Sequence, residues 1–214
     1  APANVALPET KKFGPYLAKC EISLPDGKKT DFQLQFSKML PALAAPSEYL
    51  GGHGNHPLQI AMGAGTNRFW DQDQCMLGFR VMKPDGGFDW SGVYFPPAPL
   101  KSLVVLDRMP KWAPLKEKPE LYFCYVDALT ARLKGNVAIY EIFNELYLSP
   151  EWRGDLKRYA EMVAATVAII RKNDPAAKIA TGGNSMEIPP GIDLWEEMLK
   201  AGIFKSVDII TGHF

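Results

Sequence analysis

The feature that most constrains the fold is an alternation of short apolar runs with helical patterns, which begins near residue 48 and continues to residue 214. The apolar runs predict strands at 49–54, 65–70, 103–106, 136–145, 177–185 and 207–214. Strands and helices that alternate at this spacing form parallel strands joined by right-handed helical crossovers. Two architectures satisfy that rule, a doubly wound open sheet and a closed (β/α)8 barrel.

Helix start and stop signals separate the later strands. The predicted helices run from Pro119 to Gly135, from Ser149 to Pro175 and from Asp193 to Gly202. Ser149 and Asp193 are the expected N-caps, and Pro150 suits the first helical position. Apolar stripes on the first two helices should face the core: Tyr122, Val126, Leu129 and Leu133 on the first, and Leu156, Tyr159, Val163, Val167 and Ile170 on the second.

Polar residues recur where the predicted strands end, and this decides between the two architectures. In a (β/α)8 barrel the carboxyl ends of all strands converge on one face, where active sites are built. No G-x-G-x-x-G sequence follows any strand, which weighs against a dinucleotide-binding sheet. The sequence therefore predicts an α/β protein whose residues 48–214 form part of a (β/α)8 TIM barrel. The strand-end residues are His53, Arg68, Asp107, Arg108, Asn144, Glu145, Asn184 and His213.

Residues 1–47 have a different pattern, and we expect them to form an N-terminal β appendage. Two runs of alternating polarity flank a Pro-Asp-Gly turn at residues 25–27, which predicts a β-hairpin. Ile22 lies on one of its apolar faces. A lone hairpin is only marginally stable in water, so this one should pack against another part of the protein.

Composition excludes several classes of function. Lysine plus arginine number 24 and aspartate plus glutamate number 24, with no basic stripe, so a nucleic-acid partner is not expected. No apolar run is long enough to span a bilayer. The three cysteines and three histidines are scattered without metal-ligand spacing, so the sequence predicts no disulfide framework and no metal site.

The pair Asn144-Glu145 ends an apolar strand, and its chemistry suits the cleavage of a glycosidic bond. That reaction needs one carboxyl group to protonate the leaving oxygen and another to attack the anomeric carbon or activate water. A partly desolvated strand end can keep the proton donor protonated near working pH. A neighbouring amide can bind a sugar hydroxyl as positive charge develops on the ring.

Five segments occur along the chain in an informative order: "MGAGTNRFW", "PDGGFDW", "LVVLDRMPKWAP", "IYEIFNE" and "VDIITGHF". They resemble, in turn, the second strand with its arginine, the following loop, the third strand with Pro-x-Trp, the fourth strand with Asn-Glu and the sixth strand with its histidine in the clan A retaining glycoside hydrolases. The branch that contains β-xylosidases and α-L-iduronidases is the most similar. The resemblance covers residues 48–214.

The resemblance implies an enzyme that hydrolyses O-glycosidic bonds of oligo- or polysaccharides without a cofactor. Glu145 would be the general acid and then the general base, and Asn144 would bind the sugar hydroxyl beside the reacting carbon. Trp112 would stack on a sugar ring, and His53 and His213 would bind sugar hydroxyls. The substrate would be a neutral or uronic glycoside.

Several of these residues also have plainer interpretations. By resemblance, Arg68 would hold the nucleophilic carboxylate ionised, but a surface arginine fits as well. Glu141 shares strand parity with Glu145, and we expect it to form a buried ion pair, for which Arg68 is the candidate partner. Trp112 can equally pack beneath a loop. Glu145 itself can be an exposed carboxylate near a helix N-terminus.

The sequence departs from the family pattern at two places. Residues 91–100 contain three prolines where the family has a helix, so a complete helix is not expected there. The family's nucleophile closes a seventh strand, whereas this chain stops at the sixth. We therefore expect the nucleophile and the C-terminal part of the barrel beyond residue 214, and no activity from these residues alone. The start Ala1-Pro2-Ala3 suits a processed N-terminus and a secreted or periplasmic location.

Two other functions stay open at this point. A barrel that lacks the second carboxylate would bind glycans without cleaving them. A barrel aldolase or isomerase would show a strand-end lysine or a phosphate-binding glycine loop, and neither is visible. Gly182-Gly183 is not such a loop, because no Lys-Ser/Thr follows it. This pair instead indicates a close backbone approach at a strand end.

Overall fold

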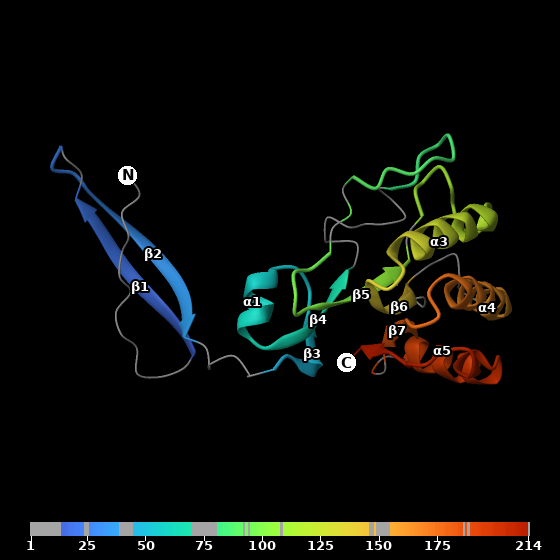
Figure 1. Cartoon of the computed structure of the whole chain (residues 1–214). Coiled ribbons are helices and arrows are strands. Elements are labelled where there is room, and N and C mark those ends of the chain that lie inside the picture. Colours follow the sequence, from blue (N-terminus) through green and yellow to red (C-terminus); the bar gives the residue numbers. More distant parts are fainter. Residues whose placement is uncertain are drawn as a thin grey trace.

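The computed structural model describes residues 14–23, 26–38, 45–69, 81–91, 93, 95–107, 109–145, 148, 155–185, 187 and 189–213. Its main feature is a curved sheet in which parallel strands follow one another in chain order (Figure 1). The strands are β3 (Ser47–Gly52), β4 (Ala64–Phe69), β5 (Lys101–Leu106), β6 (Val137–Asn144), β7 (Lys178–Ser185) and β8 (Gly212–His213). A doubly wound sheet would reverse its strand order at a switch point. The predicted barrel architecture is therefore confirmed for these six strands.

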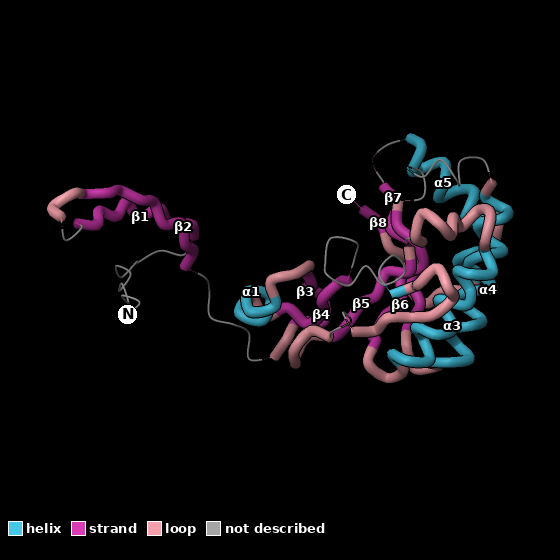
Figure 2. Tube along the Cα trace, turned by 90° about the horizontal axis from the view of Figure 1, so that it is seen from above, coloured by secondary structure: helices cyan, strands magenta, loops and turns pink. Residues whose placement is uncertain are grey.

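Helices cover the convex side of this sheet. The helices are α1 (His56–Ala61), α3 (Pro119–Leu133), α4 (Leu156–Asn173), α5 (Pro189–Lys200) and the short 3-10 helix η2 (Ile203–Lys205). Figure 2 shows α3, α4 and α5 side by side outside the curved strands, as expected for right-handed crossovers. Within the described part of the chain, no helix is long and apolar enough to cross a membrane.

The hydrophobic core lies between the sheet and these helices. All four residues of the stripe predicted on α3 are buried, and Tyr159, Val163 and Ile170 of α4 are buried with them. Aromatic rings fill the space beneath the end of β6, where Phe143 stacks on Tyr122 with ring centroids 5.4 Å apart. Phe143 also packs against Tyr159 at 5.6 Å. The helix-facing side of β6 is thus closed by large rings.

Two predicted helix starts are wrong. Helix α4 begins at Leu156, and the Asp155 side chain accepts the Arg158 backbone N–H at 3.3 Å, so Asp155 is its N-cap. Ser149 and Pro150 lie outside the described residues. Helix α5 begins at Pro189 and not at Asp193, because consecutive prolines, which lack an N–H, suit the first turn of a helix.

The predicted strands and helix ends agree better with the structure, with one exception. Gly135 and Gly202 have φ of 78° and 73°, the left-handed conformation that follows many helices. The last predicted strand, 207–214, is mostly not a strand. Only Gly212–His213 pairs as β8, and Ile209 forms an isolated bridge with Ala180. In the described part of 91–100 there is no helix, as the three prolines predict.

The N-terminal hairpin is confirmed as an element separate from the large sheet. Strands β1 (Gly14–Ser23) and β2 (Lys29–Lys38) pair antiparallel in a two-stranded sheet of their own. Figures 1 and 2 both place it apart from the curved sheet. Ile22, expected on a packed face, is 47% exposed, so the described residues do not cover that face. The domain boundary between residues 47 and 48 stays a prediction.

The N-cap of α4 yields a stability prediction. Replacing Asp155 by Ala in the full-length protein leaves the Arg158 N–H without its side-chain acceptor, and should lower the free energy of unfolding by about 1 kcal/mol. Chemical denaturation measures this change, with Ser149→Ala as the matched control. A larger loss for Ser149→Ala than for Asp155→Ala would show that the cap is misassigned.

Candidate active site

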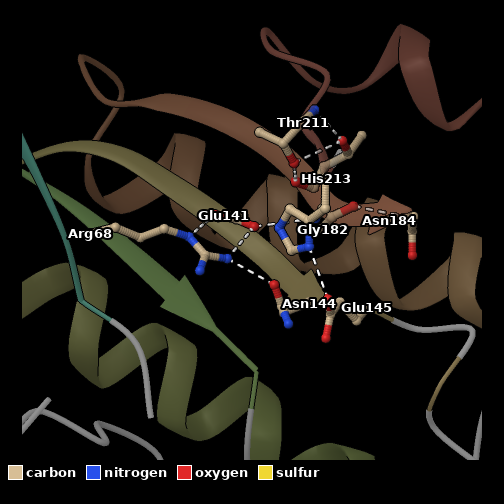
Figure 3. A network of polar contacts seen from close by, with 10 residues as sticks. Arg68, Glu141, Asn144, Glu145, Gly182, Asn184, Thr211 and His213 are labelled. Carbon is tan, nitrogen blue, oxygen red and sulfur yellow. Dashed lines mark hydrogen bonds and ion pairs between the residues drawn. The ribbon is translucent and has the colours of Figure 1, made fainter. Parts of the chain in front are cut away.

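The polar side chains predicted at strand ends gather at the carboxyl end of the sheet (Figure 3). Arg68 comes from β4, Glu141 and Asn144 come from β6, Glu145 follows β6 directly, and His213 comes from β8. Residues up to 145 positions apart in the sequence thereby reach one region, since the carboxyl ends of parallel strands converge. The five side chains form two hydrogen-bonded groups, one of Arg68, Glu141 and Asn144 and the other of Glu145 and His213.

The first group is built on an ion pair between Arg68 and Glu141. Arg68 Nε donates to Glu141 Oε2 at 2.8 Å, and Arg68 Nη2 donates to Oε1 at 2.7 Å. The Gly183 backbone N–H donates to the same Oε1 at 3.2 Å. The Glu141 side chain is 2% exposed and that of Arg68 is 16% exposed, so the pair is largely desolvated. The expected buried ion pair of Glu141 is confirmed, and it bridges β4 and β6 across β5.

The same arginine also holds Asn144. Arg68 Nη2 donates to Asn144 Oδ1 at 2.8 Å, so one nitrogen serves both the carboxylate and the amide. Asn144 is 8% exposed. Because arginine has only donors, the Asn144 oxygen must face it, and the amide nitrogen faces away (Figure 3). Asn144 therefore presents an N–H group, not a carbonyl, to the region beyond the arginine.

Unusual backbone angles at the end of β6 allow Glu141, Asn144 and the following Glu145 all to serve the site. In a regular strand successive side chains alternate between faces, so Glu141 and Asn144 would point in opposite directions. Phe143 has φ of 66°, and its ring packs against the helices together with its neighbour Ile142. This restores Asn144 to the face of Glu141. Glu145 has φ of 47° and also turns toward the site.

The second group is a contact between Glu145 and His213. His213 Nδ1 lies 3.0 Å from Glu145 Oε1, with side chains 37% and 29% exposed, respectively. The Glu145 backbone N–H donates to the Gly183 carbonyl at 2.7 Å, which fixes the residue against β7. The carboxyl group is thus close to a second titratable group and still reachable from solvent.

Gly182 and Gly183 allow β6 and His213 to approach β7 closely, which agrees with the close backbone approach predicted for this pair. A Cβ on Gly183 would lie 2.4 Å from His213 Nε2, and one on Gly182 would lie 2.7 Å from the Ile142 carbonyl oxygen. Side chains at these positions would displace either the imidazole or strand β6. The sequence signalled the approach but not its partner, because the fold alone brings residue 213 beside residue 183.

Two buried tyrosines lie under the site and stay neutral. Burial raises the pKa of Tyr122 and of Tyr159 above the ordinary phenol range. A backbone hydrogen bond with Gly182 opposes this for Tyr159, while the negative charges of Glu141 and Asp107 raise its pKa further. The site therefore rests on uncharged phenols that add no negative charge beside Glu141.

Other predicted site residues are placed less favourably or stay unassigned. Asn184 is fully buried and donates to the Gly182 carbonyl at 3.1 Å and to Met198 Sδ at 3.6 Å, so it faces α5 and not the site. It lies at the carboxyl end of β7, as predicted, but its side chain takes no part in either group of polar residues. Trp112 is partly buried and packs against the core, while His53 follows β3, which is the edge strand at the other end of the strand order from β8. Their sugar-binding roles stay predictions.

No cluster of three or more histidine, cysteine, aspartate or glutamate side chains that could bind a metal ion occurs among the described residues. Arg108 lies outside the described residues.

The ion pair yields the second prediction. Glu141→Ala in the full-length protein should lower the free energy of unfolding by about 3–5 kcal/mol, because it removes the buried carboxylate that pairs with the largely desolvated Arg68 guanidinium. The double variant Arg68→Met/Glu141→Leu removes both charges and should recover most of that loss. Chemical denaturation measures both. A double variant less stable than Glu141→Ala would contradict the ion-pair interpretation.

The contact between Gly183 and His213 yields the third prediction. Gly183→Ala should lower the free energy of unfolding by about 1–3 kcal/mol, because the added methyl group overlaps the imidazole. In a His213→Ala background the same substitution should cost little, since the space is then open. A cost that is equal in the two backgrounds would show that the glycine is needed for another reason.

No protein-family model and no curated protein matches the sequence. Solved structures do match. The chain resembles a family 39 glycoside hydrolase from the gut symbiont Bacteroides cellulosilyticus WH2, with TM-score 0.64, 14% identity, and 94% of this chain and 45% of that chain covered. It also resembles a GH10 xylanase from termite gut that contains a bacterial Ig-like domain, with TM-score 0.57, 14% identity, and coverage of 91% and 54%.

A monomeric β-xylosidase from Caulobacter crescentus CB15 matches with TM-score 0.56, 18% identity, and coverage of 79% of this chain and 43% of that chain. The chain thus spans about half the length of the solved structures that it matches. At these identities the likeness concerns the fold, and the chain has the curved parallel strands of a (β/α)8 barrel of the kind found in glycoside hydrolases.

Proposed function

We propose that the full-length protein is a retaining glycosidase with Glu145 as its general acid and base. The observation that carries this proposal is the pairing of a solvent-reachable carboxyl group with a fixed donor amide at the carboxyl end of the sheet. The fold supports it, since this end of a barrel is where active sites are built. The glycoside hydrolases among the structural neighbours support it further.

The proposed roles follow from the contacts. Glu145 protonates the leaving oxygen in the first step and then removes a proton from the attacking water. His213, 3.0 Å from one carboxyl oxygen, fixes the side chain and leaves the other oxygen for the glycosidic bond. Asn144 donates to the hydroxyl beside the reacting carbon, a hydrogen bond that strengthens in the transition state.

The nucleophile needs a second carboxylate, and Glu141 is unsuited to that role. It is 2% exposed, and its two oxygens accept three hydrogen bonds from Arg68 and Gly183. We therefore keep the expectation that the nucleophile is a glutamate at the end of a seventh strand beyond residue 214. Arg68, whose guanidinium donates to Glu141 and Asn144, would then serve mainly to hold these two side chains in place.

The first substrates to test are β-xylosides, because xylanases and a β-xylosidase are among the structural neighbours. We propose a β-xyloside as the substrate and a secreted or periplasmic location for the protein. A glycan-binding barrel without catalysis is the second candidate, and the engagement of Glu141 in an ion pair favours it if no other carboxylate faces Glu145.

Glu145→Gln in the full-length protein provides the fourth prediction. The amide keeps the shape of the side chain and cannot donate a proton, so kcat/KM for a poor leaving group should fall by about 10²–10⁴-fold. A dinitrophenyl glycoside needs no protonation, and its glycosylation step should be nearly unchanged. Azide should restore turnover, because it replaces the water that the base activates.

The matched control is Glu161→Gln, an exposed carboxylate on the outer helix α4 that should leave both rates unchanged. If Glu145→Gln hydrolyses both substrates like the wild type, Glu145 is not the acid. If the wild-type protein binds a glycan and cleaves none, the glycan-binding alternative replaces the glycosidase.

A further inference from the structure

We propose that Glu141 and Arg68 form a positioning pair, which acts on the substrate through Asn144 by fixing its amide as a hydrogen-bond donor. This inference rests on the proposed glycosidase function and assigns roles to two residues that the reaction itself does not require. Neither is a catalytic residue in this proposal. Each acts on the orientation of a third side chain.

Arginine has only hydrogen-bond donors, and this decides which Asn144 atom faces Arg68. A free asparagine can turn its amide to offer either an oxygen or a nitrogen to a ligand, at little cost. Arg68 offers only N–H groups, and Nη2 lies 2.8 Å from Asn144 Oδ1. A turned amide would place two donors against each other in a region where Asn144 is only 8% exposed. The Asn144 oxygen is thereby committed to Arg68.

Glu141 in turn fixes the orientation of the Arg68 guanidinium group. Two hydrogen bonds of 2.7 and 2.8 Å hold the guanidinium plane, and the Gly183 N–H holds the carboxylate in turn. A single contact would let the guanidinium rotate, whereas a two-point contact sets its direction. A continuous set of hydrogen bonds thus links the backbone of β7 through Glu141 and Arg68 to Asn144, and this fixes the orientation of the Asn144 amide.

The remaining amide group is the one that meets the substrate. No hydrogen bond from Asn144 Nδ2 is found within the described part of the chain, and Figure 3 shows it on the side away from Arg68. The ligand atom at this point must therefore be an acceptor. In a glycoside the matching atom is the oxygen of the hydroxyl beside the reacting carbon, which a 2-deoxy sugar lacks.

A mutant cycle in the full-length protein tests the pairing. Arg68→Met, Glu141→Gln, Asn144→Ala and the double variants with Asn144→Ala are assayed on aryl glycosides of one sugar, with and without the 2-hydroxyl group. Each single variant should lose about tenfold or more in kcat/KM on the hydroxyl substrate and little on the 2-deoxy substrate. In the Asn144→Ala background the other two substitutions should add little.

Losses that add in the double variants, or that are equal on the two substrates, would overturn the proposal, because a merely structural role affects both substrates alike. Asp174→Asn is the matched control for a destabilised fold. Asp174 is also 2% exposed but lies at the opposite end of the strands, where it accepts the Gly135 N–H at 3.2 Å. It should lower stability without changing the preference for the hydroxyl substrate.

Crystal structures of the wild type and of Glu141→Gln and Arg68→Met separate this inference from the proposed function. A turned or disordered Asn144 amide in the variants supports the positioning pair, even if the wild-type protein cleaves neither substrate and the glycosidase proposal fails. An amide that keeps its wild-type orientation in both variants overturns the positioning pair. If Arg68→Met does not fold, Glu141→Gln alone decides, because it preserves the shape of the side chain.

Discussion

The ion pair between Arg68 and Glu141 is the interaction on which the rest of the site depends. It joins β4 to β6 across β5 at the carboxyl end of the sheet, and it is largely removed from water. A desolvated charge is costly unless it is paired, so each partner fixes the other. The same guanidinium holds Asn144, and the same carboxylate is held by β7 through Gly183. Three strands are thereby tied at the point where chemistry is proposed.

A second constraint is that successive side chains of β6 point to opposite faces of the sheet. A strand offers alternate residues to each face, which would give the site either Asn144 or Glu145. Left-handed backbone at Phe143 and Glu145, which costs about 1–3 kcal/mol each, removes that restriction. Stacking of Phe143 on Tyr122 offsets part of the cost at the first position. The adjacent amide and acid can serve one site because the backbone is irregular at the end of the strand.

The sequence allowed the strand order, the barrel and the carboxyl-end cluster to be predicted, because periodicity and the convergence of parallel strands depend on local pattern and topology alone. The Arg68–Glu141 pair was predicted because a buried carboxylate needs a cation. Local pattern did not reveal the positive φ of Phe143, whose ring packs against Tyr122 and Tyr159. It misled at Ser149, since Asp155 is the N-cap of α4, and it placed Asn184 at a strand end without revealing that its side chain turns toward α5.

The proposed function and the positioning pair together require that one sugar ring meets both the Asn144 nitrogen and the Glu145 carboxyl group while Arg68 holds the Asn144 oxygen. The most direct measurement is a crystal structure of the full-length Glu145→Gln variant with an uncleaved oligosaccharide. We expect Asn144 Nδ2 within hydrogen-bond distance of the hydroxyl beside the reacting carbon, and the residue 145 side chain at the glycosidic oxygen. A sugar bound away from both residues, or an Asn144 oxygen turned from Arg68 toward the sugar, would contradict it.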